Sequence, residues 1–137
     1  MNRKKFFALL VSDGHGSLET LRALLKSQGV EVWASSNCAE AARLYEQTHP
    51  ELIFTATQHV DGTWRDVIIL AEKAAVPANV IVVGRHQNVR LYLGAMDYGA
   101  FDFILPPFEP EPIAHVVRVA AEDVRRRREA QAIEAAA

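Results

Sequence analysis

Titratable side chains lie in the short loops that directly follow three apolar segments of the sequence. They are Asp13, His15, His59, Asp61, Arg85 and His86. Three imidazoles and two carboxylates on neighbouring loops are a donor set for a transition metal, and imidazole also titrates near neutrality. The sequence lacks a close ligand spacing such as His-x-x-x-His, and surface loops collect polar residues in any protein. We therefore expect no bound metal, and these residues other than Arg85 remain the candidate ligands.

Position 56, at the end of the apolar segment 52–56, carries an alanine. In open α/β sheets, the carboxyl ends of the strands border the crevice in which ligands bind and react. A methyl group at such a position accepts no phosphoryl group, binds no metal ion and transfers no proton. We therefore expect that the protein acts by binding and is not an enzyme.

Five short apolar segments must position these residues, and a helical pattern follows each of them. The segments are 6–11, 30–34, 52–56, 80–83 and 101–105. Most are continuous rather than alternating, which is typical of strands that are covered on both faces. The second segment alternates, so it is expected at an edge of the sheet. The order predicts an α/β protein of the (βα)₅ type, with a doubly wound, five-stranded parallel sheet and a flavodoxin-like fold.

Capping residues mark the expected boundaries of the helices between these strands. The predicted N-caps are Ser17, Asn37, Thr63 and Asn88, with Glu40 and Asp66 completing two capping boxes. Gly29 and Gly99 are expected to end the first and the fourth helix. Pro112 stands near the start of the last helix, where proline is tolerated.

Length and composition agree with a single soluble domain. The chain has 137 residues and a formal net charge of -2, which gives it no general attraction to nucleic acids or anionic membranes. No segment approaches the roughly 20 apolar residues that a membrane span requires. The single cysteine, Cys38, fits a reducing compartment. We expect a cytoplasmic protein that contacts neither membranes nor nucleic acids directly.

Three stretches resemble bacterial response-regulator receiver (CheY-like) domains, and the similarity in layout covers about residues 6–122. They are Leu9-Leu10-Val11-Ser12-Asp13, the segment 50–56 with Asp61-Gly62, and the segment 95–108. Within the last, Gly99-Ala100-Phe101-Asp102-Phe103 and Pro106-Pro107-Phe108 resemble the family's Gly-Ala-x-Asp-(aromatic)-x-x-Lys-Pro-Phe pattern. The resemblance also implies a cis peptide bond before Pro107.

The resemblance implies a site for phosphoryl transfer that has lost most of its reactive groups. In that family, an aspartate after the third strand accepts phosphate from a histidine kinase, and an acidic pair after the first strand binds Mg²⁺. A Thr or Ser and a Lys then contact the phosphoryl group. The matching residues here are Ala56 for the acceptor, Ser12 and Asp13 for the acidic pair, Gly84 for the hydroxyl residue and Pro106 for the lysine. Phe103 matches the switch aromatic.

A pseudo-receiver without phosphorylation is the function that these substitutions imply. Such a module acts in two-component or phosphorelay signalling through a protein partner or an output domain. The resemblance places the partner or homodimer face on the fourth helix, fifth strand and fifth helix. The candidate residues for that face are Leu91, Tyr92, Ala95, Phe103, Val116 and Val119.

Two domain regions are expected: a receiver-like domain over residues 1–122 and a helical extension over 123–137. The extension contains the run Arg125-Arg126-Arg127-Arg128. Four consecutive positions span about one helical turn and define no single face. We favour a linker or dimerisation helix, while contact with nucleic-acid phosphates or a solvated tail are the alternatives.

The loop 12–17 allows a different, cofactor-binding interpretation. Asp13-Gly14-His15 resembles the Asp-x-His-x-x-Gly loop of cobalamin-binding domains, in which the histidine ligates cobalt. Leu18 replaces the glycine of that motif, and Arg85 stands where the second glycine of a later pair belongs. The glycine-rich loop can also present backbone N–H groups to an anion. We expect no cofactor and retain a cobalamin- or metal-binding domain as the alternative.

Overall fold

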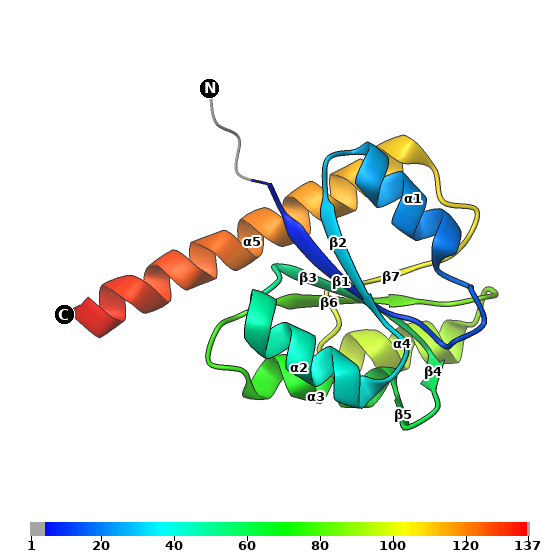
Figure 1. Cartoon of the computed structure of the whole chain (residues 1–137), viewed down its shortest axis with the longest axis horizontal. Coiled ribbons are helices and arrows are strands. Elements are labelled where there is room, and N and C mark those ends of the chain that lie inside the picture. Colours follow the sequence, from blue (N-terminus) through cyan, green and yellow to red (C-terminus); the bar gives the residue numbers. More distant parts are fainter. Residues whose placement is uncertain (1–4, 137) are drawn as a thin grey trace.

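Five parallel strands form one sheet in a computed structural model that describes residues 5–136 (Figure 1). Their order is β2–β1–β3–β6–β7, so the predicted edge position of the second strand is confirmed. The strands are β1 Phe7–Val11, β2 Glu31–Ser35, β3 Leu52–Ala56, β6 Asn79–Val83 and β7 Asp102–Ile104. A short antiparallel hairpin, β4 Gln58–His59 and β5 Gly62–Thr63, follows β3, where the sequence indicated only a loop.

Helices cover both faces of this sheet, which confirms the doubly wound fold. They are α1 Glu19–Ser27, α2 Cys38–Thr48, α3 Trp64–Lys73, α4 Val89–Tyr98 and α5 Pro110–Ala136. Figure 1 shows α1 and α5 on one face and α2, α3 and α4 on the other. Two apolar clusters fill the layers between helices and sheet. All five residues of β3 and of β6 are buried, as their continuous apolar runs predict.

Most predicted helix caps are confirmed. Thr63 and Asp66 form a reciprocal capping box, and Asn37 and Asn88 each accept a backbone N–H of the following turn. Ser17 is an exception, because α1 begins at Glu19 after Leu18 and has no side-chain cap. The residues before it form a turn in which the Glu19 N–H donates to the Gly16 carbonyl (3.2 Å). This backbone bond satisfies a donor that a capping side chain usually serves.

Glycines end two helices, and one proline bond is cis, as predicted. Gly29 and Gly99 follow α1 and α4 with φ of 81° and 114°, the left-handed conformation that favours glycine at this position. Glu40 departs from the expected capping box, since its carboxylate accepts the N–H of Ser36 rather than that of Asn37. The Pro106–Pro107 bond is cis.

The arginine run of α5 lies partly against the body of the domain. Three of its four guanidinium groups donate hydrogen bonds to other segments of the domain. The acceptors lie just before β1, just before β3 and at the first residue of β6. The four arginines point in different directions around the helix, as expected, but three of them reach acceptors on the body of the domain, which the sequence did not indicate. Residue 137 of the expected extension lies outside the described residues. In residues 5–136, none of the helices is long and apolar enough to cross a membrane.

Candidate functional site

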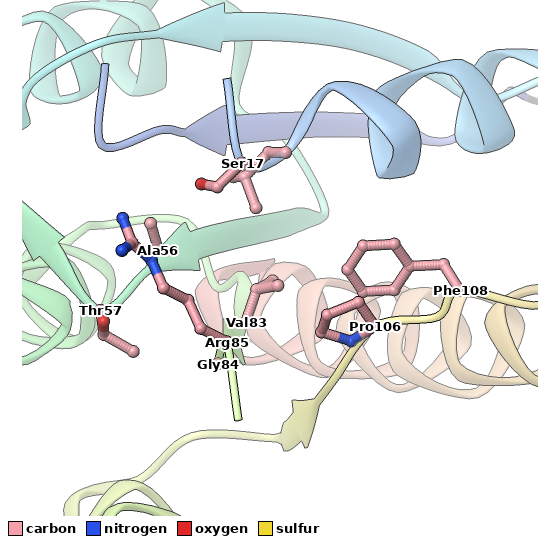
Figure 2. A pocket seen from close by; sticks show the side chains of 9 residues that line it. Ser17, Ala56, Thr57, Val83, Gly84, Arg85, Pro106 and Phe108 are labelled. Carbon is pink, nitrogen blue, oxygen red and sulfur yellow. The ribbon is translucent and has the colours of Figure 1, made fainter. Parts of the chain in front are cut away.

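A small pocket of about 140 Å³ opens at the carboxyl ends of β3 and β6. It brings together three of the positions that the sequence marks as degenerate: Ala56, Gly84 and Pro106. Figure 2 shows Ala56 and Thr57 on one side of the pocket and Pro106 and Phe108 on the other. The remaining lining residues are Ser17, Leu18, Val83 and Arg85. The pocket is mostly apolar, and Arg85 brings the only charged side chain among these lining residues.

Gly84 leaves space that an aromatic ring fills. A Cβ atom built on Gly84 would lie 2.6 Å from Cζ of Phe103 and 2.9 Å from Cδ2 of Leu105, closer than carbon atoms approach without a shift. The Phe103 ring also packs edge to face against the ring of Tyr92, with 5.9 Å between the ring centroids. Phe103 therefore occupies the space into which a Thr or Ser side chain at position 84 would project.

Asp13 is neutralised by an arginine from a neighbouring loop. Nη2 of Arg85 lies 2.5 Å from Oδ2 of Asp13, whose side chain is 5% exposed, and the backbone N–H of His15 donates to Oδ1 (2.8 Å). Burial alone would raise the pKa of Asp13, but these hydrogen bonds outweigh it and lower the pKa to about 2. The carboxylate is thus committed to a protein cation instead of being free for a metal ion.

His59 joins the ends of β1 and β3. Its Nδ1 lies 3.0 Å from the carbonyl oxygen of Ser12, and its Nε2 lies 2.8 Å from Oγ1 of the fully buried Thr55. A carbonyl oxygen only accepts, so Nδ1 carries the hydrogen of that bond. Both ring nitrogens are therefore used inside the protein, and Ser12 takes part through its backbone.

Asp61 lies away from the pocket, at the N-terminus of α2. Its carboxylate accepts the backbone N–H groups of Cys38 (2.7 Å) and Ala39 (3.0 Å), and these bonds lower its pKa. Burial and the nearby Asp61 charge raise the pKa of the Cys38 thiol to about 12. Asp61 therefore acts as a helix-capping carboxylate contributed by the β4–β5 hairpin, a role that its sequence position did not indicate.

The proposed metal ligands come together only in part: Asp13, His15 and His59 line one pocket with Arg85, whereas Asp61 and His86 do not line it. His15 and His86 are exposed, Asp13 and His59 are engaged as described, and Asp61 caps α2. Within residues 5–136, no three His, Cys, Asp or Glu side chains approach one another closely enough to hold a metal ion. The loops bring these residues to the same end of the sheet but point them to different partners. The arrangement gives no support to the cobalamin or metal alternative.

The predicted partner face is partly buried. Ala95 is 0% exposed and packs in the core, so it cannot contact a partner. Leu91, Phe103 and Val116 are also packed against the core, whereas Tyr92 and Val119 are exposed. Val89 and Leu93, which the sequence did not single out, are 65% and 54% exposed. Together with Tyr92 they have the i, i+3, i+4 spacing of one helical face, a signal that marks a surface only once the buried face is known.

Comparison with known proteins identifies this architecture. A family model of the response regulator receiver domain matches residues 8–118. The alginate biosynthesis transcriptional regulatory protein AlgB of Pseudomonas aeruginosa is 28% identical over 105 residues, which are 77% of this chain and 23% of the relative. A protein-glutamate methylesterase/protein-glutamine glutaminase of Pseudomonas fluorescens is 33% identical over 102 residues, 72% of this chain and 30% of the relative. The chain thus spans less than a third of the length of these relatives.

Solved structures share the fold. NtrX from Brucella abortus superposes with a TM-score of 0.80 at 20% identity, over 95% of this chain and 30% of that chain. A response regulator receiver domain protein from Clostridium thermocellum gives a TM-score of 0.76 at 19% identity, over 88% and 97% of the two chains. With the parallel sheet and the pocket at its carboxyl end, the match over residues 8–118 shows that the chain belongs to the response regulator receiver domain family.

Proposed function

We propose that this chain is a pseudo-receiver, a non-enzymatic binding module of two-component signalling that works in the cytoplasm without phosphorylation. One observation carries the proposal: the strand-end pocket presents a methyl group at Ala56, a glycine at 84 and a proline ring at 106. Phosphoryl transfer needs a nucleophile, a metal ion and fixed cations around the transferred group. Those three positions supply none of these groups.

The remaining carboxylate of the crevice supports the same proposal. Asp13 is held by Arg85, and a bound Mg²⁺ would have to displace that guanidinium group. One carboxylate is also a poor site for a divalent cation, which usually takes several oxygen ligands. The internal ion pair takes up the negative charge that would otherwise attract a metal ion to the crevice.

The packing of Phe103 supports a conformation that does not depend on phosphorylation. Its ring fills the space beside Gly84 and contacts Tyr92, which lies on the exposed face of α4. In a domain with a hydroxyl residue at this position, that space would be contested. We infer that the aromatic ring holds one position here, and that the α4 surface is presented permanently.

A protein partner or an attached output domain completes the proposed function. Two of the curated relatives are, by name, a transcriptional regulatory protein and a methylesterase/glutaminase, and both are longer than this chain. The α4 patch, formed by Val89, Tyr92 and Leu93, is the surface that we propose for a partner or a second copy. We also include Val119 of α5 in the proposed surface, because its apolar side chain is exposed.

Phosphorylation assays test the proposal directly. The protein is incubated with acetyl phosphate and Mg²⁺ and its intact mass is recorded; its melting temperature is measured with and without Mg²⁺ plus beryllofluoride. We expect no mass shift and no change in melting temperature. The variant Ala56→Asp should also remain unlabelled, because Pro106 and Ser12 still replace the lysine and the second acid. A phosphorylated species of the parent chain, for example at Asp61, would overturn the proposal.

A further inference from the structure

The amino-terminal end of the sheet is closed by side chains of α5. We call Arg125, Arg127 and Arg128 the basic clamp. Arg125 donates through Nε and Nη2 to Oε2 of Glu51 (3.2 and 3.0 Å) and through Nη2 to the Lys5 carbonyl (3.1 Å). Its guanidinium carbon also lies 4.3 Å from the centroid of the Phe6 ring. By itself, Arg125 connects α5 to the residues just before β1 and just before β3.

Arg128 contacts three backbone carbonyls on two other loops. Its Nε donates to Pro77 (3.0 Å), and its Nη2 donates to His49 (3.1 Å) and Pro50 (2.9 Å). His49 is the C-cap of α2, so the cation also lies at the negative end of that helix. Because the guanidinium group is planar and rigid, three simultaneous acceptors fix its orientation.

Arg127 completes the clamp through a buried amide. Its Nη2 donates to Oδ1 of Asn79 (2.6 Å), and its Nε donates to Oδ2 of Asp123 (3.1 Å). Asn79 in turn donates to the Ala120 carbonyl (2.9 Å) and to Oδ2 of Asp123 (3.0 Å). One turn later, the side chain of Gln131 donates to the Ala75 carbonyl (2.7 Å). The first residue of β6 is thereby connected to two turns of α5.

We propose that the basic clamp fixes the direction in which α5 leaves the domain. Figure 1 shows the end of α5 projecting beyond the sheet. With the clamp in place, residues 129–136 form a rigid strut at a set angle to the sheet and not a hinged linker. Within this segment the structure gives one hydrogen bond to the body of the domain, from Gln131 to the Ala75 carbonyl. A short helix with so few tertiary contacts is marginal in water, so the angle of the segment depends mainly on the turn that precedes it. The clamp supplies anchoring on three sides of that turn, because its acceptors belong to the segments before β1, β3 and β6.

Arg126 offers a matched control inside the same run. Its side chain is 70% exposed, and its contact is a 3.5 Å approach to Asp123 of the same helix. Arg126→Met removes the same charge from the same turn as Arg128→Met, but it leaves the three loop carbonyls bound. A general effect of charge or helix propensity would act on both variants, whereas the clamp acts through Arg128.

Distance measurements between two spin labels test the strut. The labels are placed at Gln47 of α2 and Ala130 of α5, both exposed, in a Cys38→Ser background. The labelled chain is diluted with unlabelled chain so that only intramolecular distances are read. We expect a narrow distribution in the parent and with Arg126→Met, and a distribution about twofold broader with Arg128→Met, because the exposed turns lose their anchoring contacts.

Two outcomes would overturn the proposal. One is an Arg128→Met distribution as narrow as that of the parent; the other is an equal broadening with Arg126→Met. If Arg128→Met lowers the melting temperature too far for the measurement, Arg128→Lys replaces it. The ammonium group keeps the charge but cannot reproduce the planar contact with three carbonyls, so the lysine variant must still broaden the distribution.

Discussion

The two ends of the sheet differ in the number and the use of their charged groups. At the carboxyl end, the pocket is lined by Ala56, Gly84 and Pro106, and one ion pair, Asp13–Arg85, crosses its rim. At the amino end, Glu51 and the basic clamp form a dense network with buried acceptors. Open α/β sheets bind and transform ligands at the carboxyl end. In this chain the richer polar network lies at the opposite end, where it fixes structure.

The two ends show that a buried charged group can serve either chemistry or stability. A charged group in a crevice suggests chemistry when it is left without a protein partner. Glu51 is bound by Arg125 and by the Phe7 N–H, and the other two arginines of the basic clamp also have acceptors in the protein, so these charged groups stabilise the arrangement of segments. Removing one partner from such a network is costly because the other charge stays buried. Substitutions at the amino end should therefore affect stability more than those in the crevice.

The largest effect is expected for Glu51→Leu. Glu51 is buried, and its two oxygens accept from the Phe7 N–H (2.8 Å) and from Arg125. The substitution leaves both donors without this acceptor, so it should lower the free energy of unfolding by about 3 kcal/mol. Urea denaturation measures this change. Glu46→Leu, at an exposed position of α2, should stay within about 0.5 kcal/mol of the parent.

A loss below about 1 kcal/mol for Glu51→Leu would contradict the comparison, because a well-packed apolar replacement would then suffice at the amino end.

A smaller effect is expected for Gly84→Thr at the carboxyl end. The new Cβ would meet Phe103 at 2.6 Å and Leu105 at 2.9 Å, so these side chains must move. Overpacking of this kind should cost about 2 kcal/mol in the free energy of unfolding. Gly94→Ala is the control, because its Cβ meets Trp64 at an ordinary 3.9 Å and the change should stabilise α4 by about 0.5 kcal/mol. Unchanged stability of Gly84→Thr would show that Phe103 moves aside freely.

The smallest effect is expected for Asp13→Asn, and it depends on pH. The folded protein lowers the pKa of Asp13 from 3.8 to about 2, so the ionised form stabilises the fold above pH 4. That stability is lost as pH falls through 2, and the difference between parent and variant should vanish there. Since Arg85 is 58% exposed, we expect only about 1 kcal/mol at pH 7.

Denaturation of parent and variant between pH 7 and pH 2 gives this difference. Asp97→Asn, at an exposed position of α4, serves as the control. A difference that grows toward acid pH would refute the assigned direction of the Asp13 shift.

Local patterns in the sequence were sufficient for most of the fold. Continuous apolar runs gave the five strands, and the same runs placed Ala56 at the end of β3. The caps at Asn37, Thr63 and Asn88 were also predictable, because each needs only residues of the following turn. The predicted cap at Ser17 is wrong, because the Gly16 carbonyl accepts the Glu19 N–H that a capping side chain usually binds.

Contacts between distant segments could not be predicted in the same way. The bonds from Arg128 to His49 and Pro50 span 79 and 78 positions, and nothing in the run of arginines indicates its acceptors. Asp61 likewise caps a helix that precedes it in the sequence. Ala95 was assigned to the wrong face, because the rotation of α4 is decided by its packing on the sheet and on α3.

The bond from Arg125 to Lys5 joins residues 120 positions apart, and this has a consequence for biosynthesis. A ribosome releases the chain from its amino terminus, so every strand emerges before the helix turn that closes the base of the sheet. Until this turn has left the exit tunnel, the buried carboxylate of Glu51 lacks its donor Arg125, and the carbonyls of Pro50 and Pro77 lack their donor Arg128. The contacts that close the base of the sheet therefore form late in synthesis, when the arginines of α5 emerge.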